Sequence, residues 1–148
     1  WDVPEGVDTF YVTVIGGGGG AAKRGLSIPG DYAGGDGASL WKTELTGILA
    51  GDQVNITIGV GGKSAIGAPS QGVSGTATTV DFLASVVTLT ADGGEGGIAN
   101  TVVGGVPGQD GWPLEGMVLR YNGQGADTAL DGSLNLTYGN PGMVLIEW

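Results

Sequence analysis

Short runs of alternating apolar and polar residues recur along this chain, and glycine bounds most of them. Residues 9–15 show the pattern most clearly, with Phe10, Val12 and Val14 on one face and Tyr11, Thr13 and Ile15 on the other. A period of two predicts a β-strand. No window keeps a helical apolar stripe over three turns without a glycine. We expect strands at 9–15, 38–46, 53–59, 76–82, 85–90, 117–121, 134–138 and 143–148.

About eight short strands separated by turn-rich segments are typical of an all-β sandwich. We therefore expect one jelly-roll-like β-sandwich over residues 1–148, which is long enough for a single domain with a core. In strand 38–46 the alternation places Leu40, Lys42, Glu44 and Thr46 on one face. In strand 53–59 it turns three side chains inward, namely Val54, Ile56 and Ile58.

Glycine is the most unusual feature of the composition, with 33 of 148 residues. Strand-like runs lead directly into glycines at 12–20, 56–62 and 89–97. Glycine is costly to order, so repeated use indicates tight turns or close backbone packing. Two structures fit: turns and bulges of a sandwich, or short polyproline II-like rods packed side by side. Disorder fits less well, because 41% of residues are apolar and only 14% are charged.

The charge balance excludes several classes of function. A net charge of −10 with five basic residues opposes binding to nucleic acid and to anionic membranes. Cysteine is absent, so the chain has no disulfide and no thiolate metal site. No apolar run approaches the roughly 20 residues of a membrane helix, and we expect no membrane insertion. The first residue is Trp1 rather than Met, and we expect a piece of a longer chain.

Six motifs in order resemble the glycine-rich domain of bacteriophage tail fibres. That family has a "VP.GV" opening, a strand ending in a glycine run, a "GG.GG" segment before a strand, a "VG.GG" ending, a "T.F" and "GG.GG" pair, and a closing "PG.V.IEW" strand. The counterparts lie at 1–7, 12–20, 34–40, 49–62, 75–97 and 141–148. The stretch between Ile98 and Asn140 departs from the pattern.

The resemblance implies a receptor-binding module at the C-terminal tip of a tail fibre, located on the virion and without catalysis. Its partners would be a host surface glycan or an outer-membrane protein, together with other fibre proteins, in a homotrimer. The receptor would meet the loops predicted at 21–37, 98–116 and 122–132. A structural virion protein, such as a capsid decoration or fibre-connecting domain, is the alternative.

Aromatic and basic residues in these loops are the candidate receptor contacts. Exposed aromatic rings stack on sugars or anchor protein contacts, and arginine is favoured at interface hot spots. Trp112 lies between Gly111 and Pro113 in the longest predicted loop. We expect Trp41 and Tyr138 to pack in the core, and Trp1 and Trp148 to be structural. The candidate set is Trp112, Tyr32, Tyr121, Arg120, Arg24 and Asp110.

Little in the sequence favours catalysis. Without histidine or cysteine, Ser-His and Cys-His systems are excluded. A glycosidase needs only two carboxylates, but loop acids more often cap turns. The acids considered are Asp31, Asp36, Asp92, Glu95, Asp110, Glu115, Asp127 and Asp131.

Cofactor and metal sites also lack a clear motif. The glycines at 16–20 are not followed by a helix, which a dinucleotide site requires. Asp110 and Asp131 stand beside glycine and offer oxygens to calcium, but no EF-hand pattern is present. We expect no catalytic residue, no cofactor and no metal, with a structural calcium ion as the alternative.

Overall fold

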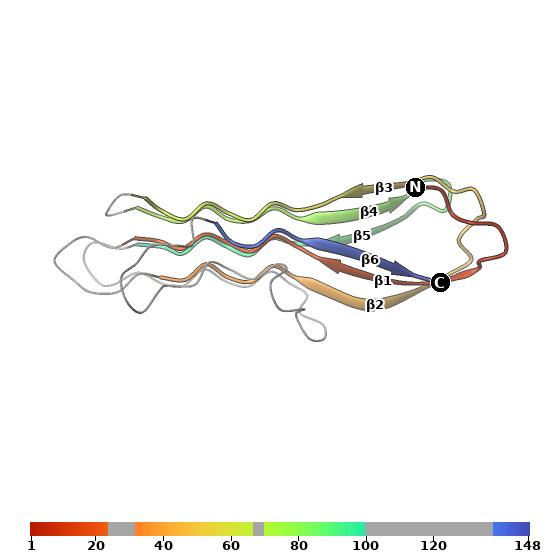
Figure 1. The fold of residues 1–148 in the computed structure, drawn as a ribbon, viewed down its shortest axis with the longest axis horizontal. Helices are drawn as coiled ribbons and strands as arrows, with labels where there is room; N and C mark the ends of the chain where they lie inside the picture. Colours follow the sequence, from red (N-terminus) through yellow and green to blue (C-terminus); the bar gives the residue numbers. More distant parts are fainter. Residues whose placement is uncertain (24–31, 67–69, 100–137) are drawn as a thin grey trace.

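The computed structural model describes residues 1–23, 32–66, 70–99 and 138–148. Within these ranges the fold is all-β, without a helix, and has six strands (Figure 1). The strands are β1 (Thr9–Ile15), β2 (Ser39–Thr46), β3 (Val54–Thr57), β4 (Thr78–Phe82), β5 (Val87–Ala91) and β6 (Met143–Glu147).

The strands form two three-stranded antiparallel sheets, in the orders β2-β1-β6 and β3-β4-β5. One core joins them, because buried side chains of both sheets belong to the same cluster. The rings of Phe10 on β1 and Phe82 on β4 lie 6.4 Å apart, with both side chains buried. The predicted grouping of Phe10, Val12 and Val14 on one face of strand 9–15 is confirmed, since all three lie in this core.

The predicted strands agree with the structure where it describes them. β1 has the predicted bounds, and the other five differ by no more than two residues at either end. The predicted strand 117–121 lies outside the described residues, and so does the predicted strand 134–138 except for Tyr138, so the eight-stranded jelly roll stays a prediction. Residues 83–86 form the turn between β4 and β5.

The face predicted for strand 38–46 is wrong because a β-bulge interrupts β2. The register shifts opposite Val12–Val14, and Lys42 has a φ of 46°. The extra residue moves later side chains to the other face. Leu40 and Leu45 therefore both pack against the core, although simple alternation separates them.

The bulge also covers the outer face of β1. The Lys42 amide donates to the Thr13 hydroxyl at 3.2 Å, and the Lys42 ammonium lies 3.3 Å from the Glu147 carboxylate of β6. Because β1 lies between β2 and β6, this ion pair spans it. Thr13 and Ile15, predicted to share the second face with Tyr11, are buried, whereas Tyr11 is exposed.

Each strand continues into a glycine-rich rod of extended chain, drawn as side-by-side undulating segments in Figure 1. The central rod, 16–21, continues β1. Its Gly16 and Gly19 amides donate to Ala38 and Gly35, whereas its Gly17 and Gly20 amides donate to Thr76 and Val73. Each neighbour is thus met at every third residue, which is the period of a polyproline II helix. The other rods are 33–38, 59–66, 70–77, 92–98 and 139–142.

Among the described residues, the five other rods pack against the central one in a fixed order. Hydrogen bonds join 33–38 to 92–98, 92–98 to 70–77, 70–77 to 59–66, and 59–66 to 139–142. Residues 33–37, predicted as part of a loop, are therefore wrongly assigned: they form a packed rod. Figure 1 shows the bundle continuing the sheets, with both chain ends at the sheet end. We call the opposite end the far end.

Close packing explains why the rods need glycine. A methyl group on Gly19 would overlap the carbonyl of Glu95, and one on Gly94 would overlap the carbonyl of Gly35. The central rod is hydrogen-bonded to all five other described rods and is glycine throughout 16–20. Outer rods need small residues only on the sides that face other rods.

Two polar side chains fix the ends of the sheets. The Thr78 hydroxyl donates to the Ile15 carbonyl at 2.6 Å and accepts from the Gly59 amide at 2.9 Å, where sheets give way to rods. At the other end, the Asp52 carboxylate accepts from the amides of Ala84 and Ser85 at 2.7 and 2.9 Å. Burial raises the pKa of Asp52, but these hydrogen bonds outweigh it and hold the pKa below its ordinary value of 3.8.

Candidate binding surface

Two outer rods, 59–66 and 92–98, expose side chains with a period of three. On rod 59–66 the residues Val60, Lys63 and Ile66 are exposed, while Gly62 and Ser64 between them are buried. A polyproline II helix advances about 9 Å per turn, so these side chains stand about 9 Å apart along the rod. The rod bundle thus presents regularly spaced side chains on a backbone that glycine packing holds in place.

One side of the bundle is apolar and contains an exposed tyrosine. Rod 59–66 lies between rods 70–77 and 139–142, with the Val73 amide bonded to the Lys63 carbonyl at 2.9 Å and a β-bridge between Lys63 and Tyr138. Ile66 is 70% exposed, Val60 62%, Val73 57% and Tyr138 54%. We call this surface the rod wall; its members are Val60, Lys63, Ile66, Val73 and Tyr138. The rod wall therefore carries four exposed apolar side chains and one lysine on neighbouring segments, and apolar groups gathered on one surface mark interaction sites.

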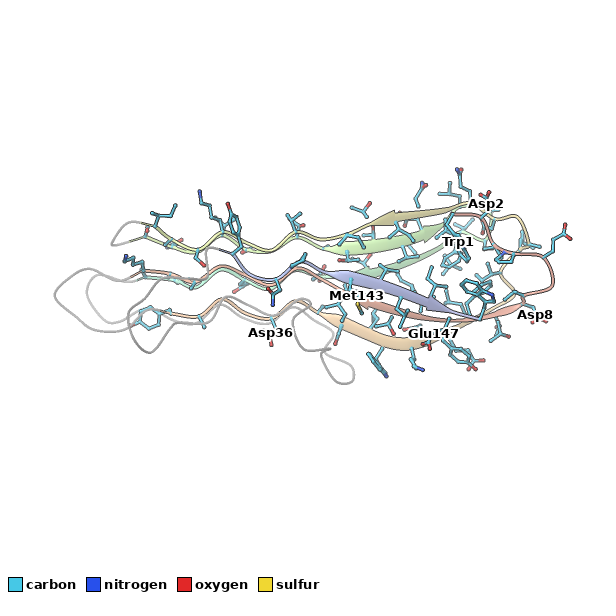
Figure 2. All side chains as sticks on the ribbon, viewed as in Figure 1. Trp1, Asp2, Asp8, Asp36, Met143 and Glu147 are labelled. Atoms are coloured by element: carbon cyan, nitrogen blue, oxygen red, sulfur yellow. The ribbon has the colours of Figure 1, made fainter. Side chains whose placement is uncertain are left out.

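Another side of the bundle is acidic. Asp92 and Glu95 are exposed on rod 92–98, and the neighbouring rod 33–38 carries Asp36 (Figure 2). Asp92 and Glu95 stand one rod turn, about 9 Å, apart, whereas calcium ligands lie about 2.5 Å from the ion. Across the described residues no group of three acidic side chains could hold a metal. The other acids considered, Asp31, Asp110, Glu115, Asp127 and Asp131, lie outside the described residues.

The far end brings together segments that are distant in sequence. Ala22 bridges Tyr32, Lys23 bridges Ser70, and the Ala65 amide donates to the Ala21 carbonyl at 2.9 Å. Of the predicted receptor contacts, the structure places Tyr32 here, half-buried. The remaining five, Arg24, Asp110, Trp112, Arg120 and Tyr121, lie outside the described residues.

The other aromatic predictions have mixed outcomes. Tyr138 is exposed, so its predicted core position is wrong. Trp41 is half-buried on β2 and is not among the side chains of the core. The Trp1 ring lies 6.1 Å from Phe10 and 5.7 Å from Trp148, which agrees with a structural role for both terminal tryptophans.

Sequence reasoning missed the rod wall. The signal was present in residues 59–66, where small residues fill the positions between Val60, Lys63 and Ile66. A search for larger side chains with a period of three between small residues would have found it. Tyr138 joins the rod wall by pairing with Lys63. This contact between distant residues cannot be predicted from a local sequence pattern.

The comparisons with known proteins identify the family. The model of the glycine-rich domain matches residues 1–143. The chain belongs to the glycine-rich domain family. Neither a curated protein nor a solved structure matches this family member. In the part of the chain that the structure describes, no helix is long and apolar enough to span a membrane.

Proposed function

We propose that this glycine-rich domain is a non-enzymatic receptor-binding module of a phage tail fibre, carried on the virion. The observation that carries the proposal is the layout of the molecule: both termini lie at the sheet end, and the rods extend away from it (Figure 1). A module mounted by its termini would present the far end outward. The ordered resemblance to tail-fibre domains supports the same conclusion.

In this proposal the receptor, a host glycan or an outer-membrane protein, binds at the far end. Tyr32 is on that end, and the other proposed contacts are Arg24, Asp110, Trp112, Arg120 and Tyr121. A homotrimer would multiply weak contacts into firm attachment. Other fibre proteins would hold the sheet end, and no cofactor would be required. The eight-stranded jelly roll belongs to this proposal as well.

Adsorption of the purified domain to host cells tests the proposal. Trp112→Ala should reduce adsorption at least tenfold, because truncating a hot-spot aromatic costs about 2 kcal/mol or more. Exchange of the 98–116 segment should change which host is bound. Val86→Ala is the control, because Val86 is 87% exposed in the turn at the sheet end. Full adsorption by both altered chains, with unchanged Tm, would overturn the proposal.

The rod wall favours a second candidate, a structural virion protein that packs sideways against other virion proteins. Changing Val60, Ile66 and Val73 together to serine should leave Tm nearly unchanged, because all three are exposed. If this variant still adsorbs to cells but no longer binds virion proteins, the wall is an assembly surface. New reducing ends in host polysaccharide incubated with the domain would instead indicate an enzyme.

A further inference from the structure

The amino-terminal residues begin a strand along the outer edge of β3. The Val54 amide donates to the Trp1 carbonyl at 2.8 Å, and the Trp1 amino group donates to the Val54 carbonyl at 3.4 Å. Asp2 bridges Gln53, and the Val3 amide donates to the Asp52 carbonyl at 2.9 Å. These pairs run antiparallel in one register, and Figure 1 places the N-terminus beside the start of β3.

Beyond Val54 this edge of β3 has no partner among the described residues. Since the Val54 backbone groups point to Trp1, alternation turns those of Asn55 toward β4 and those of Ile56 outward. Ile56 pairs directly with Val80, so its side chain points to the core side of the sheet. Val80 is fully buried, whereas Ile56 is 41% exposed and Ile58 is 45% exposed.

The facing edge of the other sheet is β6. The Gly142 amide donates to the Gly59 carbonyl at 2.8 Å, so β6 begins beside the end of β3. At the other end of both strands, Trp148 packs on Trp1. Figure 2 labels Trp1, Met143 and Glu147 along this side of the two sheets. Between these two contacts, no further named strand pairs with the outer edge of β3 or of β6 among the described residues.

We propose that an extended segment joined to the amino group of Trp1 closes this edge as a fourth strand of the β3-β4-β5 sheet. Continuing the register pairs the residues before Trp1 with Asn55, Ile56 and Thr57 in turn. The Trp1 side chain faces the core. By alternation, the second and fourth residues before Trp1 also face the core, where their side chains lie beside those of Ile56 and Ile58. The proposal applies to a chain that continues before Trp1, and it is independent of receptor binding.

Two extended chains of identical composition test the proposal. One carries Val-Thr-Val-Thr directly before Trp1, which places both valines on the core side. The other carries Thr-Val-Thr-Val, which places both threonines there. The first should have a Tm higher by several degrees, and its Ile56 amide should exchange with solvent about tenfold more slowly than in the second.

Equal Tm values, with an equally unprotected Ile56 amide in both chains, would overturn the proposal. Sedimentation of the chain without an extension adds a second check. If that chain forms dimers in which the Ile56 amide is protected, and neither extension displaces the dimer, the edge belongs to a second copy and the proposal fails. A monomer in which only the first extension protects Ile56 supports it.

Discussion

Single glycines in the central rod are expected to be intolerant of even a methyl group. In Gly19→Ala the new carbon would overlap the Glu95 carbonyl, which is backbone held by a bond from the Gly35 amide. Overpacking of this kind costs about 1–3 kcal/mol or more, so Tm should fall by about 3–10 °C. Thermal unfolding followed by circular dichroism measures the loss.

The matched control for this substitution is Val60→Ala on an outer rod. Val60 is 62% exposed, so its truncation should change stability by no more than about 0.5 kcal/mol. A Gly19→Ala chain as stable as the control would show that the rods can move apart. Close packing would then not be the reason for the glycine run.

The Asp52 carboxylate makes the stability of the turn depend on pH. Its folded pKa lies below the ordinary value of 3.8, so its contribution is complete above 3.8 and is lost as pH falls through the folded pKa. Asp52→Asn should therefore lower Tm near neutral pH, and the difference from the unaltered chain should shrink as the pH falls below 3.8. Thermal unfolding over a pH series measures both effects.

Asp8→Asn serves as the control for the pH series, because Asp8 is exposed and its side chain makes none of the turn contacts. It should leave the pH dependence of Tm unchanged. A gap between the unaltered chain and Asp52→Asn that stays constant down to the acid transition would contradict the role given to the carboxylate.

At the scale of elements, Thr78 couples a sheet to the rods. Thr78→Val keeps the shape but removes the hydroxyl that bonds to Ile15 and Gly59. Leaving buried backbone groups unpaired costs about 1–3 kcal/mol, and Tm should fall by about 2–10 °C. Thr78→Ser keeps the hydroxyl and should lose only about 1 kcal/mol with its methyl group.

Hydrogen exchange distinguishes this role from simple packing. In Thr78→Val the Gly59 amide loses its acceptor and should exchange faster than the global loss of stability explains. In Thr78→Ser the Gly59 amide keeps its acceptor and should exchange no faster than the global loss of stability explains. If both variants expose the Gly59 amide equally, the hydroxyl is not what holds the rod to the sheet.

The strands could be predicted because side-chain alternation is local, and all six described strands lie within the predicted runs or close to them. The bulge in β2 could not be predicted, because the residues around Lys42 keep alternating in the sequence. Lys42 has a positive φ and pairs with Glu147, which lies far along the chain. For the rods, the glycine run at 16–20 has no side chains to show a period. The sequence is therefore equally compatible with glycine-rich turns and with polyproline II-like rods.

At the scale of the whole molecule, the candidate surface was harder to predict than the fold. The wall residue Tyr138 stands in an alternating run, which favours a core strand, but it bridges Lys63 across a large sequence separation. The order of the five outer rods around 16–21 is likewise set by bonds between distant segments. Local patterns predict elements, whereas the surface follows from how those elements meet.

Sheets and rods are expected to unfold together. The central rod is the direct continuation of β1, and the rods bury backbone rather than large side chains, so they have little apolar burial to stabilise them alone. Phe82→Leu in the core should cost about 1–2 kcal/mol and speed exchange of the Val12 amide about 5- to 30-fold. If unfolding is cooperative, the Gly17 amide should accelerate by the same factor, although it is bonded to Thr76 in the rods and not to the core. A Gly17 amide that keeps its protection while Val12 loses it would mean that the glycine bundle is a separate folding unit, held by its backbone hydrogen bonds alone.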